Sequence, residues 1–220
     1  AVPNMFVLGD SHALSMLPAL DEALRLESRA AWFVAPCPPL LGVHPVVPQS
    51  AGTDCAALNQ RVLDFVRKHR PRQVVLMARW AFYTDGGHDG RNWRFLDVGS
   101  NGRADPGLSR AAFLQGLRST VTAYRALGVP LVLVAQVPEQ RHDARTLYFR
   151  TVRDHGGIPP AALDRYAVTP AEHRRLQAWV REAMSRYQQQ PGVTVLSLDD
   201  VYCDPGRCPI GSTDASRYHD

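Results

Sequence analysis

The feature that most constrains the fold is a short apolar run near the start of the chain that ends in a turn and leads into a helix. Residues 5–8 read Met-Phe-Val-Leu, and Gly9 ends the run. A continuous apolar run of this length is typical of a strand buried on both faces of a parallel sheet. Asp10 and Ser11 are good N-cap residues, so they predict a helix from His12 to Leu26. Its apolar stripe is formed by Leu14, Leu17, Leu20, Leu24 and Leu26.

This arrangement places Ser11 at a strand–turn–helix junction. There its hydroxyl can stand above the edge of the sheet, and nearby backbone N–H groups can face a developing oxyanion. A serine nucleophile requires that geometry. The simpler alternative is that Asp10 and Ser11 only cap a helix.

The rest of the chain alternates strand and helix patterns. We expect strands at residues 30–35, 73–78, 129–137 and 193–198, and helices at 58–69, from 105 or 109 to 127, and 169–189. The Gly- and Asp-rich residues 84–107 predict an excursion over the site. The order predicts one domain over residues 1–220, an α/β flavodoxin-like three-layer sandwich with a central five-stranded parallel sheet.

Polar and aromatic residues follow two of the predicted strands. In an open parallel sheet, ligands gather beyond the carboxyl ends of the strands, so Ser11 and Arg79 should be neighbours. Arg79 could act as a charged donor to an oxyanion, and Trp80 could form an apolar wall or stack on a sugar. The alternatives are a surface salt bridge and a core tryptophan. His142 and Asp143 follow the fourth strand and are further candidates for the site.

Composition limits the function classes. A chain of 220 residues with 45% hydrophobic residues suits one α/β domain with a sizeable core. It has no apolar run of about 18 residues, so no membrane span is predicted. The net charge is +4 without a dense basic stripe, so nucleic-acid binding has little support. The chain opens without a signal peptide, and we interpret it as an excised domain or mature fragment whose export signal would lie outside it.

Four cysteines form two local pairs in the sequence. Cys37 and Cys55 bracket a proline-rich loop, and Cys203 and Cys208 bracket a turn-rich segment. Short loops cost little entropy to close, so we predict these two disulfides and an oxidising compartment. Zinc binding is the alternative, but the usual C-x2–4-C knuckles of a zinc site do not occur as a pair, since Cys37 and Cys55 lie far apart in the sequence.

Several motifs then carry a family resemblance. The G-D-S-H sequence at residues 9–12 resembles block I of the SGNH (GDSL-like) hydrolase superfamily, in the form found in SGNH domains fused to acyltransferase-3 membrane proteins. A C-P-P-L-x-G loop at 37–42, A-R-W at 78–80, C-x4-C at 203–208 and Y-x-D at 218–220 follow in family order. The A-R-W sequence stands where the superfamily usually has G-x-N-D, whose asparagine donates to the oxyanion.

The resemblance implies a catalytic role for Ser11 as nucleophile and for Asp220 as the acid of the D-x-x-H block, whose histidine would come three residues later. His219 and His12 are the alternative bases. The oxyanion would be bound by the backbone N–H groups of Ser11 and Gly42, with Arg79 assisting. The residues expected to contact substrate are Asp10, His12, Trp80 and Tyr83.

By the same resemblance, the domain is an O-acetyltransferase that moves an acetyl group through acyl-Ser11 to a hydroxyl of a bacterial surface polysaccharide such as an O-antigen. It would work in the periplasm and receive the acetyl group from a membrane acyltransferase-3 partner, with no metal or diffusible cofactor of its own. The alternatives are a GDSL-type carbohydrate or acyl esterase and a non-catalytic glycan-binding module.

Overall fold

The computed structural model describes residues 3–47, 53–99, 102–157 and 163–211. The predicted acid Asp220 and the alternative base His219 lie outside the described residues. Among the helices of the described ranges, none has the length and hydropathy needed to cross a membrane.

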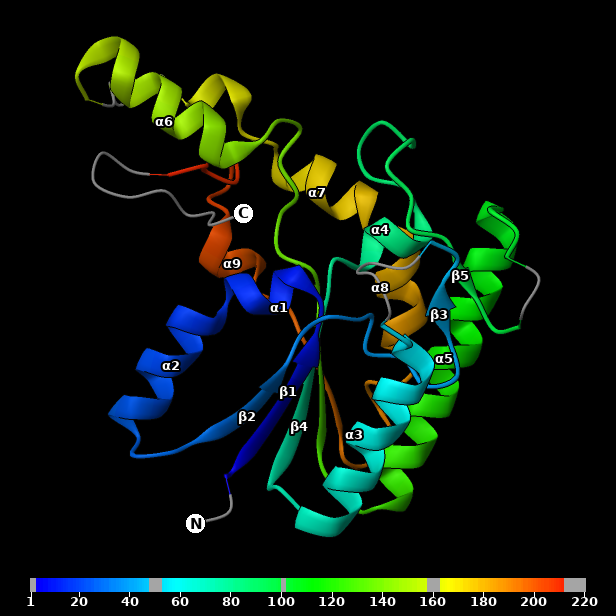
Figure 1. Cartoon of the computed structure of the whole chain (residues 1–220). Coiled ribbons are helices and arrows are strands. Elements are labelled where there is room, and N and C mark those ends of the chain that lie inside the picture. The colour runs from blue at the N-terminus through cyan, green and yellow to red at the C-terminus, as the bar shows by residue number, and fades with distance from the viewer. Residues whose placement is uncertain (1–2, 48–52, 100–101, 158–162, 212–220) are drawn as a thin grey trace.

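A five-stranded parallel sheet forms the centre of the molecule (Figure 1). Its strands are β1 (Met5–Gly9), β2 (Ala31–Val34), β4 (Gln73–Met77), β6 (Leu131–Val134) and β7 (Val193–Leu196). They lie in the order β2-β1-β4-β6-β7, with every neighbouring pair parallel. This is the doubly wound flavodoxin-like order, so the predicted fold class is confirmed. A short antiparallel pair, β3 (His44–Pro45) and β5 (Leu96–Asp97), lies apart from the main sheet.

Helices cover both faces of the sheet. They are α1 (Ser11–Ser15), α2 (Leu17–Leu26), α3 (Cys55–His69), α4 (Trp80–Thr84), α5 (Pro106–Ala126), α6 (Ala144–His155), α7 (Pro170–Leu176), α8 (Ala178–Ser185) and α9 (Asp199–Tyr202), with a 3-10 turn at Asp164–Tyr166. In Figure 1, α3, α5 and α8 lie on one side of the sheet, α2 lies on the other, and α6 projects from the end where the strands finish.

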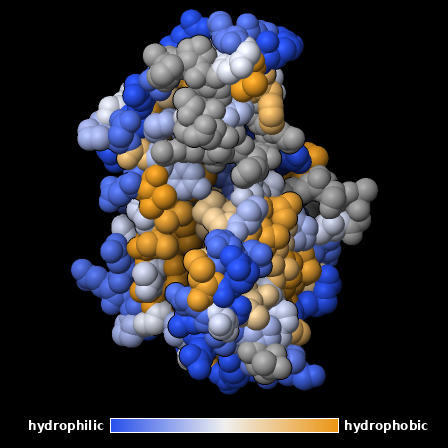
Figure 2. Space-filling view, turned by 90° about the vertical axis from the view of Figure 1, so that its left-hand side faces the viewer, coloured by the Kyte–Doolittle hydropathy of each residue, from blue (hydrophilic) through white to orange (hydrophobic). Residues whose placement is uncertain are grey.

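The two faces of the sheet are covered unequally. The larger core, on the side of α3, α5 and α8, buries Phe6, Leu76, Phe113, Leu117 and Leu133. On the opposite side, α2 has no buried residue. The expected leucine stripe is buried only in part: Leu20 packs against the smaller core, whereas Leu14 and Leu26 are 53% and 73% exposed. Figure 2 shows hydrophobic side chains gathered on this face of the molecule.

Two of the expected helices differ from the structure, and helix α6 was not predicted. The helix expected at 12–26 breaks at Met16, because Pro18 lacks the N–H that a continuous helix would need and instead occupies the first turn of α2. The helix expected at 169–189 is divided at Gln177 into α7 and α8. Its predicted start is confirmed by a capping box between Thr169 and Glu172. Helix α6 is an addition to the predicted elements; it packs Tyr148, with Leu147 and Val152, in a small separate hydrophobic cluster.

The end of β1 is packed too closely to accept a side chain. A Cβ atom on Gly9 would lie 1.9 Å from the carbonyl oxygen of Met77 and 2.5 Å from the Cβ of Ala13. The carbonyl belongs to the neighbouring strand β4, so only a backbone shift could relieve the clash. Gly9 therefore lets β1, β4 and α1 meet at the edge where Ser11 stands.

We expect Gly9→Ala to lower the free energy of unfolding by about 1–3 kcal/mol, because the added methyl group would clash with the backbone of β4. Urea unfolding at neutral pH measures the change. Gly99→Ala is the matched control, since a Cβ there meets nothing within 4 Å. Equal stability of the two variants would contradict the close-packed junction.

Candidate active site

A buried carboxylate joins the ends of two neighbouring strands. Asp10 follows β1 and is only 3% exposed. Its oxygens accept hydrogen bonds from the backbone N–H of Arg79 at 3.0 and 3.2 Å and from the Tyr83 hydroxyl at 2.8 Å. One of them also accepts the backbone N–H of His12 at 3.0 Å, which caps α1. The position between β1 and β4 is the point where the strand order reverses, and such points hold the ligand site in doubly wound sheets.

Ser11 is the first residue of α1 and is exposed to solvent. Asp10 caps α1 and also accepts the backbone N–H of Arg79 after β4. These two contacts fix the position of Ser11, which lies between Asp10 and the rest of α1. Within the described residues, the Ser11 hydroxyl makes no hydrogen bond to a histidine. The general base that the resemblance implies thus stays a prediction, as does the role of Asp220.

The side chain of Arg79 points away from Asp10 and pairs with a carboxylate from the end of β6. Its Nε and one terminal nitrogen lie 3.1 and 2.8 Å from the two oxygens of Glu139. Its guanidinium also lies over the Phe82 ring, at 4.3 Å from the centroid. Burial alone would raise the pKa of Glu139, but the hydrogen bonds and charge of Arg79 outweigh it and hold that pKa below its ordinary value. The pair is therefore charged at neutral pH.

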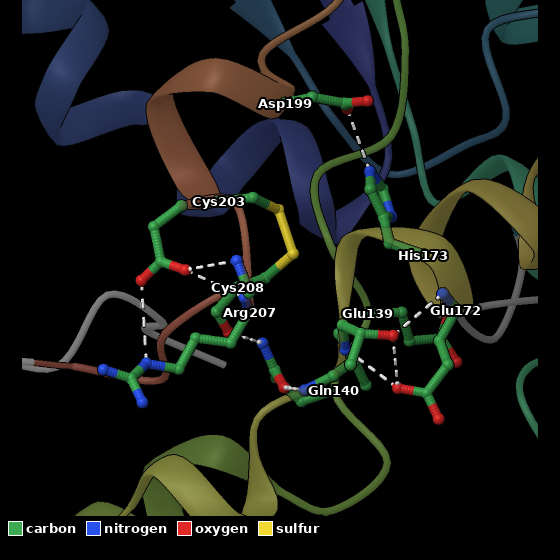
Figure 3. The surroundings of a disulfide bond; sticks show 12 residues. Glu139, Gln140, Glu172, His173, Asp199, Cys203, Arg207 and Cys208 are labelled. Atoms are coloured by element: carbon green, nitrogen blue, oxygen red, sulfur yellow. Dashed lines mark hydrogen bonds and ion pairs between the residues drawn. A yellow bond between two sulfur atoms is a disulfide. The ribbon is translucent and has the colours of Figure 1, made fainter. Parts of the chain in front are cut away.

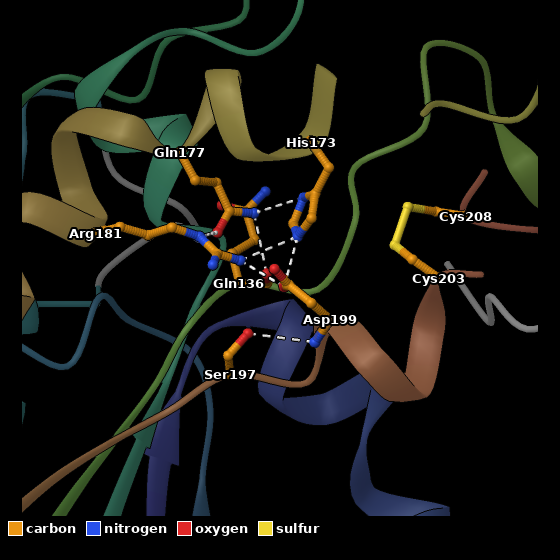
Figure 4. A network of polar contacts seen from close by, with 8 residues as sticks. All are labelled: Gln136, His173, Gln177, Arg181, Ser197, Asp199, Cys203 and Cys208. Atoms are coloured by element: carbon orange, nitrogen blue, oxygen red, sulfur yellow. Dashed lines mark hydrogen bonds and ion pairs between the residues drawn. A yellow bond between two sulfur atoms is a disulfide. The ribbon is translucent and has the colours of Figure 1, made fainter. Parts of the chain in front are cut away.

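Glu139 is itself held by a buried amide. The side chain of Gln136 donates to Glu139 at 3.1 Å and accepts the backbone N–H of Ala81 at 2.8 Å. Its backbone carbonyl accepts a bond from Gln177 at 3.0 Å. The Arg79–Glu139 pair is thus connected to the polar network shown in Figure 4.

The far end of that network is a buried histidine. Gln177 donates to Nδ1 of His173 at 3.1 Å, so the ring carries its proton on Nε2, which lies 3.0 Å from the Asp199 carboxylate. Burial lowers the pKa of His173 and keeps the ring neutral, although Asp199 acts in the opposite direction. Burial would raise the pKa of Asp199, but hydrogen bonds from Arg181 and His173 lower it to about 2.

A cavity of about 720 Å³ lies beside α1 and the carboxyl ends of β4 and β6. It is lined by His12, Ser15, Met16, Arg79, Gly87, His88, Asp89, Asn92, residues 137–143 and Tyr202. His12 and Arg79 thus reach the cavity, as do the candidates His142 and Asp143. The Tyr202 hydroxyl lies 3.0 Å from the sulfur of Met16, which joins α9 to the break between α1 and α2.

Three of the residues expected to contact substrate are buried instead. Trp80 has no exposed surface; its indole N–H donates to the Val134 carbonyl at 2.8 Å and its ring packs against Phe113. Tyr83 is equally buried, and its hydroxyl is used by Asp10. The expectation of substrate contact is therefore wrong for Trp80, Tyr83 and Asp10, because α4 turns these rings into the core and Asp10 is enclosed between strands.

Gly42 occupies an exposed turn with a φ of +72°, a conformation that favours glycine. Its neighbours are held against α5, since the Leu41 N–H donates to Thr120 at 2.8 Å and Val43 is buried beside Gly116. Gly42 does not line the cavity. Its part in an oxyanion hole stays a prediction.

Both predicted disulfides, Cys37–Cys55 and Cys203–Cys208, are confirmed. The second one lies beside a wall of the cavity (Figure 3). The side chain of Gln140 donates to the Cys208 carbonyl at 2.9 Å and accepts the Val168 N–H at 3.0 Å. The Cys208 N–H in turn donates to the Val168 carbonyl at 2.8 Å. The segment after Cys203 is thus tied to the loop that follows β6.

The sequence reading overlooked Glu139, Gln136 and His88. The signal that could have found Glu139 is a charged residue soon after a predicted central strand, since these strand ends meet at the ligand edge of the sheet. Its partner Arg79 is 60 residues away in sequence, so only the strand order reveals the pairing. Gln136 and His88 have no comparable sequence signal.

These observations define a doubly wound α/β protein with an exposed serine, a paired arginine and a cavity at the point where the strand order reverses. The chain belongs to the family described as "SGNH domain (fused to AT3 domains)", whose model matches residues 1–220. No curated protein matches the chain in a sequence search.

Two solved structures align with this chain, and the first of them shows a likeness in fold. The periplasmic domain of the lipopolysaccharide acetyltransferase of Salmonella ser. Paratyphi A aligns with a TM-score of 0.65 at 14% identity, over 99% of this chain and 74% of that one. A GDSL-like lipase from Bacteroides thetaiotaomicron aligns with a TM-score of 0.41 at 10% identity, over 94% of this chain and 80% of that one. At these identities the likeness concerns the fold alone.

The pKa of Asp199 predicts a pH dependence of stability. Its folded value of about 2 lies below its ordinary value of 3.8, so the stabilisation is present above about pH 4 and is lost as the pH falls toward 2. We expect Asp199→Asn to lower the free energy of unfolding by roughly 1–2 kcal/mol near pH 6, with a difference that shrinks toward pH 2. Urea unfolding over that range tests this, with the exposed neighbour in Asp200→Asn as control. A deficit independent of pH would refute the assignment.

Proposed function

We propose that this domain is a serine O-acetyltransferase that modifies a hydroxyl of a bacterial surface polysaccharide, such as an O-antigen-like glycan. The observation that carries the proposal is the exposed Ser11 at the first turn of α1, next to Asp10 and next to His12, which lines the cavity together with Arg79. Membership of a family of SGNH domains fused to AT3 domains supports the same chemistry.

The reaction has two steps. In the first, the Ser11 oxygen attacks the carbonyl carbon of an acetyl donor and its proton passes to the base; the bond from that carbon to the donor's leaving group then breaks, and the leaving group takes the proton from the base. In the second, a sugar hydroxyl attacks acyl-Ser11, the bond to the serine oxygen breaks, and the sugar proton passes through the base back to Ser11. The base in this proposal is the histidine of the D-x-x-H block, oriented by Asp220.

Negative charge develops on the carbonyl oxygen in both steps. The backbone N–H groups of Ser11 and Gly42 and the side chain of Arg79 are the proposed donors to it. Glu139 holds the guanidinium of Arg79 through two bonds, so the donor is oriented before the acyl group arrives.

The proposed location is the periplasm, with the acetyl group delivered by a fused membrane acyltransferase-3 domain. Two disulfides suit an oxidising compartment. The similar Salmonella structure is described as the periplasmic domain of a lipopolysaccharide acetyltransferase, which agrees with this placement.

We expect Ser11→Ala in the full-length protein to abolish acyl-enzyme formation and to lower transfer by at least about a thousandfold. The measurement is intact mass after incubation with p-nitrophenyl acetate, followed by detection of acetylated glycan or free acetate. Ser185→Ala is the control, because Ser185 is an exposed helical serine of α8 that does not line the cavity. Acetate without acetylated glycan would indicate an esterase, and a fully active Ser11→Ala variant would refute the proposal.

Glu139→Gln should lower kcat by about tenfold or more and change KM little, because the orientation of Arg79 matters when charge develops on the oxyanion. The control is Glu172→Gln, which removes the partner of Arg141 on another wall of the cavity. Steady-state kinetics with p-nitrophenyl acetate and thermal unfolding of each variant separate the catalytic effect from lost stability. A change in KM alone would count against the positioning role of Glu139.

A further inference from the structure

A rigid loop forms one wall of the cavity. Residues 86–92 follow α4, and the backbone N–H of Asn92 donates to the Gly86 carbonyl at 2.7 Å, which closes the loop on itself. The ring Nε2 of His88 lies 2.6 Å from the Glu139 carbonyl oxygen. That bond ties the loop to the segment that follows β6 and hence to the residues that hold Arg79.

Packing beneath the loop fixes its shape. A Cβ atom on Gly86 would lie 2.0 Å from the indole nitrogen of Trp93, so only glycine fits against the ring. The Trp93 N–H donates to the Gly90 carbonyl at 2.9 Å, and its ring stacks on Phe95 at 5.0 Å between centroids. The loop is thus ordered by its own contacts, and a ligand would not need to order it.

Two polar side chains of this loop are exposed at the cavity. Asp89 and Asn92 both line it. The Arg91 N–H donates to Asp89 at 3.0 Å and orients the carboxylate. A carboxylate accepts several hydrogen bonds, and an amide both donates and accepts them. Together they match the hydroxyl groups of a sugar, which also donate and accept.

The charges around the cavity argue for an uncharged ligand. Each of the two arginines that line it is ion-paired, Arg79 with Glu139 at 2.8 Å and Arg141 with Glu172. Among the lining histidines, His88 is engaged by a carbonyl. An acidic sugar would therefore meet the exposed carboxylate of Asp89 and arginines whose charge is already compensated, and like charges across an interface disfavour binding.

The size of the cavity points to more than an acetyl group. Its volume of about 720 Å³ falls within the range of roughly 300–1,000 Å³ that holds a drug-sized ligand. An acetyl group is far smaller than that space, which leaves room for sugar rings.

We propose that residues 86–92 form the acceptor-recognition loop and that the acceptor is a neutral sugar whose hydroxyls bond to Asp89 and Asn92. This inference rests on the proposed function and adds to it the chemical class of the acceptor. The loop residues act on the second step alone, because the acceptor sugar takes no part in the first step.

The test uses the full-length protein with p-nitrophenyl acetate as donor and two acceptors of matched shape, methyl glucoside and methyl glucuronide. Release of p-nitrophenol reports the first step, and mass spectrometry of the acetylated sugar reports the second. We expect at least tenfold more transfer to the glucoside. Asn92→Ala should lower transfer to the glucoside at least tenfold more than it lowers p-nitrophenol release, and Asp89→Asn should raise the glucuronide-to-glucoside ratio at least threefold.

Asp21→Asn is the control for charge removal, since Asp21 is an exposed residue of α2. It should leave both readouts as in the unmodified protein. Preference for the glucuronide, no transfer to the glucoside, or equal loss of both readouts in Asn92→Ala would each overturn the inference. Failure of the proposed function looks different, because Ser11 would then carry no acetyl group after the first step.

Discussion

The structure of the site depends on the burial of one carboxylate, that of Asp10. A buried carboxylate is costly unless donors satisfy it, and here the donors come from three elements: α1, the end of β4, and α4. The carboxylate therefore specifies how β1 and β4 end relative to each other. This contact positions both Ser11 and Arg79. Ser11 follows Asp10 in the chain, and Arg79 donates its backbone N–H to the Asp10 carboxylate.

The sequence predicts those features that depend on neighbouring residues. The strand, glycine and cap at the start of the chain are local patterns, and they place Ser11 correctly at the beginning of a helix. The burial of the Trp80 side chain, in contrast, does not follow from its neighbours in the sequence. Arg79 immediately precedes α4 and reaches the cavity, whereas Trp80, the first residue of the helix, enters the core. The partner of Arg79 depends on strand order and lies outside any sequence window.

Apolar periodicity also shows its limit in α2. The leucine pattern correctly indicates a helix, because the spacing follows from helical geometry. Whether such a face is buried depends on what packs against it. Leu14 of α1 and Leu26 at the end of α2 both remain exposed. Helix α6 is the converse case, since no element is predicted for its residues, yet it buries Tyr148 in a small hydrophobic cluster. In this chain, the apolar periodicity of a helix therefore does not determine how much of its surface is buried.

Polar side chains form a continuous hydrogen-bonded chain along the ligand edge of the sheet. The polar chain across it runs through Asp199, His173, Gln177, Gln136, Glu139 and Arg79. Its two ion pairs, Arg181 with Asp199 and Arg79 with Glu139, are separated by neutral amides. Each pair is thus internally compensated, and the amide dipoles fix orientation without adding net charge. A guanidinium held this way is positioned strongly but attracts a permanent anion weakly. That combination suits charge that appears only during a reaction, and it agrees with a neutral acceptor.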